Sequence, residues 1–107
     1  MLKFLSKEDN LDTLLAESTS KPVLLNFFAT WCPPCRMLGK EIERLEDKYK
    51  DQYTVIKVDV DQFNDLAAQY NVSSIPASFF VRNNEVVENK VGYMDLGTLT
   101  AKLTKLK

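Results

Sequence analysis

The 107-residue chain has no histidine, only two cysteines, one tryptophan and three glycines. Without histidine, it cannot build an imidazole metal site or use histidine as a catalytic acid or base. No apolar run approaches the ~20 residues that a membrane-spanning helix requires. The formal net charge of -1 gives no electrostatic reason to bind nucleic acid or an anionic membrane. We therefore expect neither nucleic acid nor membrane as a partner.

The length and composition predict a single domain over residues 1–107, with 45% hydrophobic and 27% charged residues. The first residues become charged at Lys7 and Glu8 before a signal-peptide core forms, which favours a cytoplasmic protein. A chain from which a leader had been removed would look the same. In the cytoplasm, an isolated Cys-x-x-Cys motif favours redox or metal chemistry over a structural disulfide.

Hydrophobic patterning predicts the element order β-α-β-α-β-α-β-β-α. The expected strands are a short apolar start ending at Phe4 and Leu5, then 23–29, 53–60, 77–82 and 85–91. The expected helices are one capped by Ser6 and running to about Ser18, then 33–49, 64–70, and a last one carrying Leu96, Leu99, Leu103 and Leu106. Asn83 and Asn84 form the expected hairpin turn, since asparagine tolerates positive φ. This order predicts parallel strands, an antiparallel hairpin at the end, and helices on both faces of the sheet.

The segment from Thr30 to Arg36 holds both cysteines and the tryptophan, between an apolar strand and a helix. The spacing of Cys32 and Cys35 puts both sulfurs on one side of the first helical turn, close enough to bridge. The N–H groups and dipole at a helix N-terminus stabilise a thiolate at Cys32 and lower its pKa. Pro33 fits this first turn, as does the proline after it, because their missing N–H groups cost little there. The buried face of this helix is expected to carry Met37, Leu38, Ile42, Leu45 and Tyr49.

Two simpler interpretations of the cysteine pair are a buried unreactive pair and half of a zinc site. No other cysteine and no histidine is present, so one chain cannot complete a four-ligand N/S zinc site. We therefore predict no metal site and favour redox chemistry.

The chain resembles a thioredoxin over nearly its whole length. The resemblance rests on Phe27-x-Ala29-x-Trp31-Cys32-x-Pro34-Cys35, the strand end at 58–61, Ile75-Pro76 before a strand, and Val91-Gly92 before the last helix. It implies the thioredoxin fold, an α/β arrangement in which four helices flank a central mixed five-stranded sheet.

The resemblance also implies a protein-disulfide reductase. Cys32 would be the exposed attacking thiol and Cys35 the buried resolving thiol. The pair would carry the electrons as a reversible dithiol and disulfide, with no separate cofactor. Its partners would be disulfide-containing proteins and a thioredoxin reductase fed by a nicotinamide coenzyme, in electron transport and cell redox homeostasis. A monomer is the default expectation.

In this family the pair faces a cis-proline, which would be Pro76, beside a shallow substrate-binding surface. The alternatives are a trans proline that starts a strand at Pro76, a core position for Trp31, and a partly exposed loop position for Tyr93. The expected substrate-binding residues surround the pair: Trp31, Pro33, Pro34, Ile75, Gly92 and Tyr93.

The chain departs from the common family pattern at four positions: Asn26 replaces aspartate, Pro33 replaces glycine, Lys40 replaces proline, and Asn84 replaces glycine. An acid at position 26 helps the buried thiol of family members lose its proton, and Asn26 cannot act as a general base. Lys57, which the resemblance places nearby, would then lack a carboxylate partner. We expect it to deprotonate more easily, pair with Asp59 or water, or reach the surface. Asn26 as a simple hydrogen-bonded core amide is the alternative.

Three other functions compete with a reductase. The same chemistry could serve an oxidant, an isomerase or a relay for one partner, which the redox potential would reveal. A binding module would hold a partner without turnover. A metal carrier would use both thiols, with two chains able to share one ion, and would copurify with zinc or copper.

Overall fold

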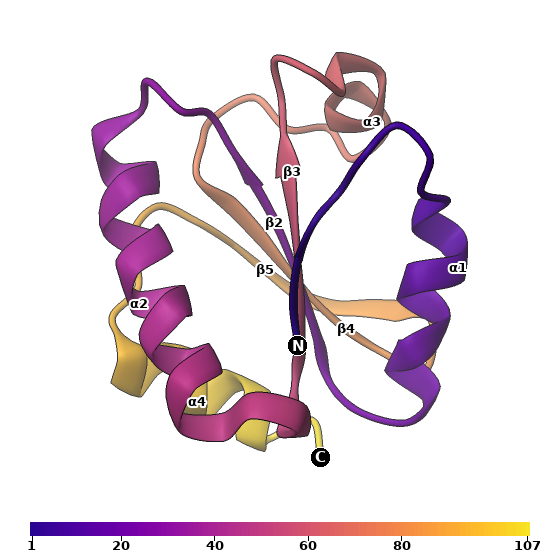
Figure 1. Ribbon diagram of the computed structural model, residues 1–107, viewed down its shortest axis with the longest axis vertical. Coiled ribbons are helices and arrows are strands. Elements are labelled where there is room, and N and C mark those ends of the chain that lie inside the picture. Colours follow the sequence, from indigo (N-terminus) through magenta and orange to yellow (C-terminus); the bar gives the residue numbers. More distant parts are fainter.

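The computed structural model describes all 107 residues and contains five strands in one sheet (Figure 1). The strands are β1 (Leu2–Phe4), β2 (Val23–Phe28), β3 (Thr54–Asp59), β4 (Ala77–Arg82) and β5 (Glu85–Val91). They lie in the order β1-β3-β2-β4-β5. The first three are parallel, whereas β4 is antiparallel to both β2 and β5. The predicted mixed five-stranded sheet is therefore confirmed.

Four α-helices flank the sheet, as predicted. They are α1 (Leu11–Leu15), α2 (Pro33–Tyr49), α3 (Asn64–Gln69) and α4 (Leu96–Thr104), and short 3-10 turns follow α1 and α2 at Ala16–Thr19 and Lys50–Gln52. Helices α2 and α4 cover one face of the sheet, and α1 and α3 cover the other (Figure 1). No helix combines the length and the apolar character that crossing a bilayer requires.

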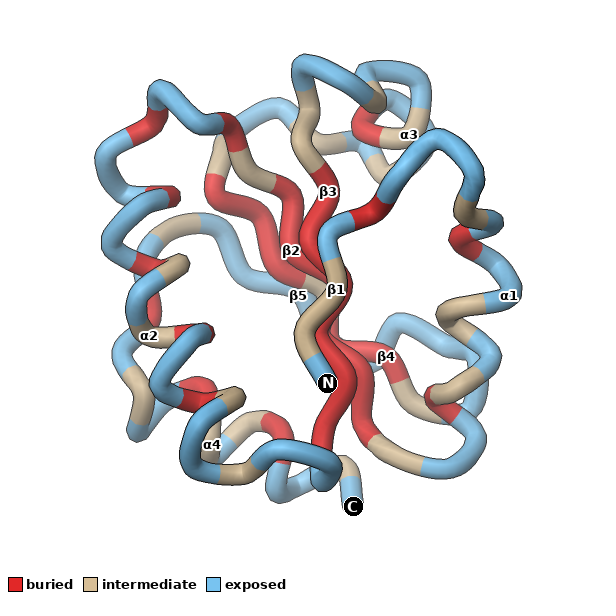
Figure 2. Tube along the Cα trace, viewed as in Figure 1, coloured by how far each residue is buried: buried red, intermediate tan, exposed pale blue.

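Each face of the sheet has its own hydrophobic core. Phe27 and Val58 belong to the core under α1 and α3, whereas Leu24 and Phe80 belong to the core under α2 and α4. Side chains alternate along a strand, so neighbouring residues of β2 serve opposite cores. Figure 2 shows the buried strands at the centre and the exposed outer sides of the helices. Full burial of one such side chain contributes roughly 2 kcal/mol.

The first helix begins later than predicted, and Ser6 is not its N-cap. The N–H and hydroxyl of Ser6 donate to Asp9 Oδ2 over 2.8 and 3.0 Å, which closes a turn instead of opening a helix. Asn10 is the N-cap, because its Oδ1 accepts the N–H of Thr13 at 3.1 Å. The predicted Ser6 cap is therefore wrong: the Asp9 carboxylate holds that serine in another turn.

The prediction that Met37 belongs to the buried face of α2 is wrong, because its side chain is 55% exposed. The buried stripe follows Cys35, Leu38 and Ile42 at helical spacing. Met37 precedes Leu38 by one residue, and one residue turns a helix by about 100°, toward solvent. Similarly, Leu106 lies beyond the end of α4, although it still packs against the core.

The hairpin between β4 and β5 turns at Asn83 and Asn84, whose φ angles are 54° and 64°. Both asparagines are in the left-handed region that a two-residue turn of this type requires. The predicted turn is confirmed, with Asn84 replacing the glycine that is common in the family.

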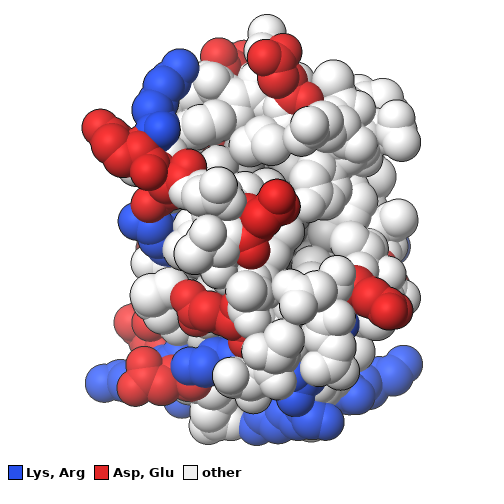
Figure 3. All heavy atoms as spheres, turned by 90° about the vertical axis from the view of Figure 1, so that its right-hand side faces the viewer, with Lys and Arg blue, Asp and Glu red and all other residues white.

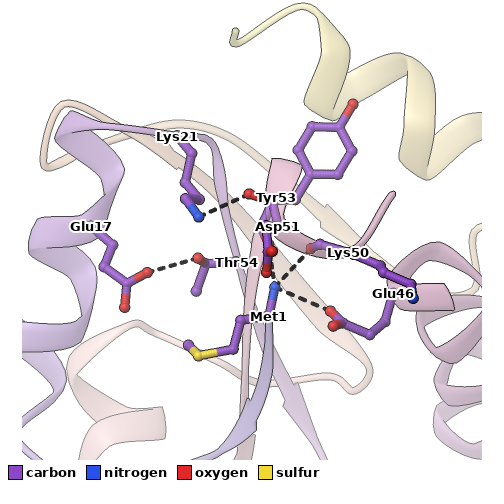
Figure 4. A network of polar contacts seen from close by, with 8 residues as sticks. All are labelled: Met1, Glu17, Lys21, Glu46, Lys50, Asp51, Tyr53 and Thr54. Carbon is purple, nitrogen blue, oxygen red and sulfur yellow. Dashed lines mark hydrogen bonds and ion pairs between the residues drawn. The ribbon is translucent and has the colours of Figure 1, made fainter. Parts of the chain in front are cut away.

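A polar network ties the elements together at the amino ends of β1 and β3 (Figure 4). Thr54 Oγ1 donates to Glu17 Oε1 at 2.9 Å, linking β3 to the turn after α1. The amino nitrogen of Met1 lies 3.1 Å from Glu46 Oε1 on α2. These contacts lie at the end of the sheet opposite the cysteines, which follow the carboxyl end of β2.

Candidate active site

Cys32 and Cys35 lie where β2 ends and α2 begins. Cys32 is the N-cap of α2, with extended backbone angles (φ -93°, ψ 111°), and Pro33 and Pro34 are the first helical residues. The N–H of Cys35 donates to Cys32 Sγ at 3.3 Å. A helix N-terminus therefore directs a donor at the sulfur of Cys32, the arrangement that stabilises a thiolate there.

The two cysteines are joined as a disulfide, with their Cα atoms 5.2 Å apart. Cys32 is only 4% exposed and Cys35 3% exposed. The prediction that Cys32 is exposed is therefore wrong for the disulfide-bonded protein. Its sulfur is covered because it packs with Ala29 and Cys35 and faces the loop before β4.

The loop before β4 brings Ile75 and Pro76 to the disulfide. The Ile75–Pro76 peptide bond is cis, so the trans alternative does not apply. The sulfur of Cys32 lies 3.9 Å from the carbonyl oxygen of Ile75. The N–H of Gly92 donates to the carbonyl of Pro76 at 2.8 Å, and Gly92 has a φ of 104° that favours glycine. Three segments distant in sequence therefore meet at Cys32.

The rim of the disulfide is exposed and partly aromatic. Trp31 is 64% exposed, which rules out the alternative of a core position. Its indole N–H donates to Asp61 Oδ2 at 2.8 Å, in the turn after β3. Tyr93 is also exposed, as are Pro33 and Pro34. Pro33 and Pro34 lie between the cysteines, Trp31 precedes Cys32, and the predicted role of these residues in substrate binding stays a prediction. The Asp61 contact was not predicted.

Asn26 is a buried amide on β2, 1% exposed. Its side-chain nitrogen donates to Ser78 Oγ on β4 at 3.2 Å, which provides the partner that a core amide needs. On the other side, Asn26 is paired in register with Lys57 of β3. Paired residues of parallel strands project from the same face of the sheet, so the amide and the lysine occupy neighbouring positions.

Lys57 is buried, 7% exposed, and has no carboxylate within ion-pair distance. Its Nζ lies 4.5 Å from the centre of the Phe28 ring and 5.2 Å from that of Phe4, in cation–π geometry. Burial lowers the pKa of Lys57, while the negative charge of Glu43 acts in the opposite direction. The direction of this pKa shift agrees with the prediction of easier deprotonation, and no ion pair joins Lys57 to Asp59.

Gly39 of α2 is another contact of Lys57 that was not predicted. A β-carbon on Gly39 would lie 3.3 Å from Lys57 Nζ, so a side chain here would press on the ammonium group. Gly39 precedes Lys40, which replaces the proline that is common in the family. Ser78 was also not predicted, although it is paired in register with Asn26 on the side opposite Lys57.

A separate hollow of about 290 Å³ lies between α1 and α3, on the side seen in Figure 3. Its apolar lining includes Phe63, Leu66 and Tyr70, with Asp9 and Asp12 at its edge. Burial raises the pKa of Tyr70, helped by the charge of Asp12. None of the predicted site residues lines this hollow, so it is not part of the cysteine site.

Comparison with protein families gives one match, in which the thioredoxin family model aligns with residues 3–105. Thioredoxin of Mycoplasmoides gallisepticum is 37% identical over 93 residues, which cover 87% of this chain and 90% of that protein. Mitochondrial thioredoxin of Mus musculus is 38% identical over 89 residues, which cover 83% of this chain. The 89 aligned residues cover 54% of the mouse protein, so the chain spans about half the length of that relative.

Among solved structures, the chain is similar to reduced thioredoxin pre-protein of Schistosoma mansoni, with a TM-score of 0.84 and 34% sequence identity. The superposition covers 99% of this chain and 98% of the other. The likeness therefore extends over the whole sheet and all four helices.

Proposed function

Because the chain belongs to the thioredoxin family, we propose that it works mainly as a reductant of protein disulfides. It is a thiol–disulfide oxidoreductase, and protein-disulfide reduction is its expected activity. The observation that carries the proposal is the position of Cys32 as N-cap of α2, with Cys35 within disulfide distance.

In the proposed mechanism, the Cys32 thiolate attacks a sulfur of the substrate disulfide. A mixed disulfide forms, and the other substrate sulfur leaves as a thiolate. Cys35 loses its proton and attacks Cys32 Sγ, which releases the second substrate thiolate and leaves Cys32–Cys35 oxidised. Two electrons pass from the enzyme to the substrate. The N–H of Cys35 and the dipole of α2 stabilise the attacking thiolate.

Substrate binding is assigned to the exposed rim. Trp31 supplies a large apolar surface held in place by Asp61, and Tyr93 supplies a second aromatic ring. Ile75, beside the cis Pro76, offers backbone groups to an extended substrate chain as a strand would. Pro33, Pro34 and Gly92 complete the rim.

The proposal includes the electron supply and the setting. A thioredoxin reductase that draws on a nicotinamide coenzyme would regenerate the dithiol, and no cofactor other than the cysteine pair is needed. We place the protein in the cytoplasm, as a monomer, because a dithiol reductant works where thiols are kept reduced.

Insulin reduction tests this function. With a thioredoxin reductase or dithiothreitol as electron donor, we expect the wild type to accelerate insulin precipitation and Cys32→Ser to abolish the effect. If insulin is reduced with dithiothreitol but not with the reductase, the chain is active and the reductase is not a suitable electron donor. A wild type without turnover from either donor would instead indicate a binding module.

A second candidate is an oxidant, isomerase or partner-specific relay, favoured by Pro33 between the cysteines and by the buried Asn26. Pro33 lies between the cysteines, and Asn26 is paired in register with Lys57, which lines the same hollow as Cys35. Equilibration with glutathione separates the two functions. A potential near the thioredoxin value of about -270 mV supports the reductant, and one near that of protein disulfide isomerase, about -180 mV, supports the second candidate.

A further inference from the structure

The ammonium group of Lys57 has no carboxylate partner. The side chain is 7% exposed and forms no ion pair, and its Nζ is open to solvent on one side. Its contacts are the ring faces of Phe28 and Phe4. Ring faces replace only part of the hydration that a buried cation loses, so an anion close to Nζ would be strongly favoured.

A hollow of about 400 Å³ lies against this ammonium group. Its charged lining consists of three cations, Lys57, Arg36 and Lys40, and one carboxylate, Glu43. Cys35 lines the same hollow as Lys57. The excess of positive charge favours an anionic ligand.

Gly39 keeps the helix above Lys57 free of a side chain. A β-carbon at this position would lie 3.3 Å from Nζ, tighter than normal packing. Arg36 uses one nitrogen to donate to the carbonyl of Thr30 at 3.2 Å, and its remaining N–H groups are free for a ligand. A guanidinium fork matches the two oxygens of a carboxylate.

We propose that this hollow is a binding site for a small carboxylate of the size of formate or acetate, which pairs with Lys57 and accepts the proton of Cys35. The hollow has ample room for such an anion. A carboxylate is favoured because its two oxygens match the guanidinium fork of Arg36 and can also reach one ammonium group.

The role in proton transfer rests on the proposed function, because it concerns the resolving step. In the mixed disulfide, Cys35 is a thiol and must lose its proton to attack Cys32 Sγ. The bound carboxylate takes that proton and becomes the acid, the new Cys32–Cys35 bond forms, and the substrate sulfur leaves with the electron pair. The acid then returns its proton to water. Asn26, the nearest polar side chain paired with Lys57, has no basic group for this step.

Glu43 is the competing occupant. It lies one turn beyond Gly39 on α2, is exposed, and makes no ion pair with Lys57. If the Glu43 side chain filled the site in solution, added carboxylate would not bind, which would overturn the proposal.

Binding is tested by NMR titration of the oxidised protein with acetate at constant ionic strength, chloride replacing acetate. We expect saturable shifts of the backbone amide signals of Arg36 and Gly39, which line the hollow, and loss of saturation in Lys57→Met. Gly39→Ala should weaken binding, and its matched control Gly97→Ala should not, because a β-carbon at Gly97 makes only ordinary contacts. Lys48→Met, an exposed site on the same helix, is the charge control. Absence of saturation in the wild type, or equal binding by Lys57→Met, would overturn the proposal.

The resolving step is tested by stopped-flow release of the second substrate thiol from a preformed mixed disulfide. We expect roughly a tenfold acceleration by acetate, part of the ~100-fold or more that a positioned general base supplies. Chloride at the same ionic strength should have no effect. Reduction that proceeds without any dependence on acetate would overturn the proposal and leave the proposed function intact. Acetate binding by a protein that reduces no disulfide would instead show that the proposed function had failed.

Discussion

Cys32 and Cys35 differ little in exposure, 4% and 3%, so accessibility does not assign their roles. Their backbone positions do. Cys32 has extended angles as N-cap and receives the N–H of Cys35, whereas Cys35 lies within the first turn of α2 on its buried face. The helix dipole favours negative charge at Cys32. We therefore assign attack to Cys32 and resolution to Cys35.

Replacing Asn26 by aspartate should accelerate the resolving step. The new carboxylate would be paired in register with Lys57 and would supply a base near the buried thiol. We expect roughly a tenfold faster release of the second substrate thiol, with a new pH dependence, measured by stopped flow. The Ser78 hydroxyl, which accepts from Asn26, can rotate to donate to the aspartate, so the fold should persist. An unchanged rate and pH profile would show that position 26 is only a structural amide.

The burial of Lys57 predicts how stability depends on pH. Because its pKa is lowered in the folded protein, the unfolded chain binds more protons between that pKa and the usual value of 10.5. The contribution of Lys57 to the free energy of unfolding therefore rises with pH across this interval and is smallest below it. Urea unfolding should show the wild type gaining stability relative to Lys57→Met as pH rises through the interval.

Lys48→Met, an exposed substitution on α2, is the control for that comparison. Its difference from the wild type should stay flat with pH. A flat difference for Lys57→Met as well would mean that the ammonium finds a partner in solution.

Helix α2 organises the site through residues in its first two turns. Pro33 and Pro34 begin it, Gly39 clears space over Lys57, and the helix continues without interruption through Lys40. Lys40, at the position where the family commonly has a helix-kinking proline, lies within regular helix. This helix therefore serves both the thiolate and the ammonium.

Because Asn10, and not Ser6, is the N-cap of α1, removing the Asn10 side chain should destabilise the protein. Asn10→Ala removes the acceptor for the N–H of Thr13 and should lower the free energy of unfolding by about 1 kcal/mol. Asn89→Ala, an exposed position on β5, is the matched control and should change it little. Urea denaturation measures both. A loss no greater than in the control would argue against Asn10 as the cap.

The strands and most helices could be predicted from the sequence because their signals are local. β4 and β5 have the predicted bounds, and the Asn83-Asn84 turn follows from asparagine at positive φ. The start of α1 could not be predicted, since Ser6 and Asn10 are equally good N-caps and the choice depends on Asp9.

The surroundings of Lys57 could not be predicted for a different reason. Phe4, Phe28 and Gly39 approach it from three separate elements, and no local pattern relates them. The burial of Cys32 likewise depends on the loop at Ile75, 43 residues away. The resemblance gave the residue types of the site, and the packing of distant segments decides their environment.

In the molecule as a whole, the polar network of Figure 4 and the cysteine pair lie at opposite ends of the sheet. The polar network of Met1, Glu46, Glu17 and Thr54 holds the amino ends of the parallel strands, whereas the cysteines follow the carboxyl end of β2 (Figure 4). Ligand sites of open α/β sheets commonly lie beyond the carboxyl ends of the strands. The surroundings of the disulfide are formed by four segments: the end of β2, the start of α2, and the loops before β4 and α4.

Trapping of the mixed disulfide tests most directly whether Cys32 attacks and Cys35 resolves. The variants Cys35→Ser and Cys32→Ser, each with one thiol, are incubated with a disulfide-containing protein, and the covalent adducts are measured by mass spectrometry. Cys35→Ser should accumulate an adduct through Cys32, because no thiol is left to release the substrate. Cys32→Ser should form almost none. Equal or greater adduct formation through Cys35 in Cys32→Ser would contradict the assignment.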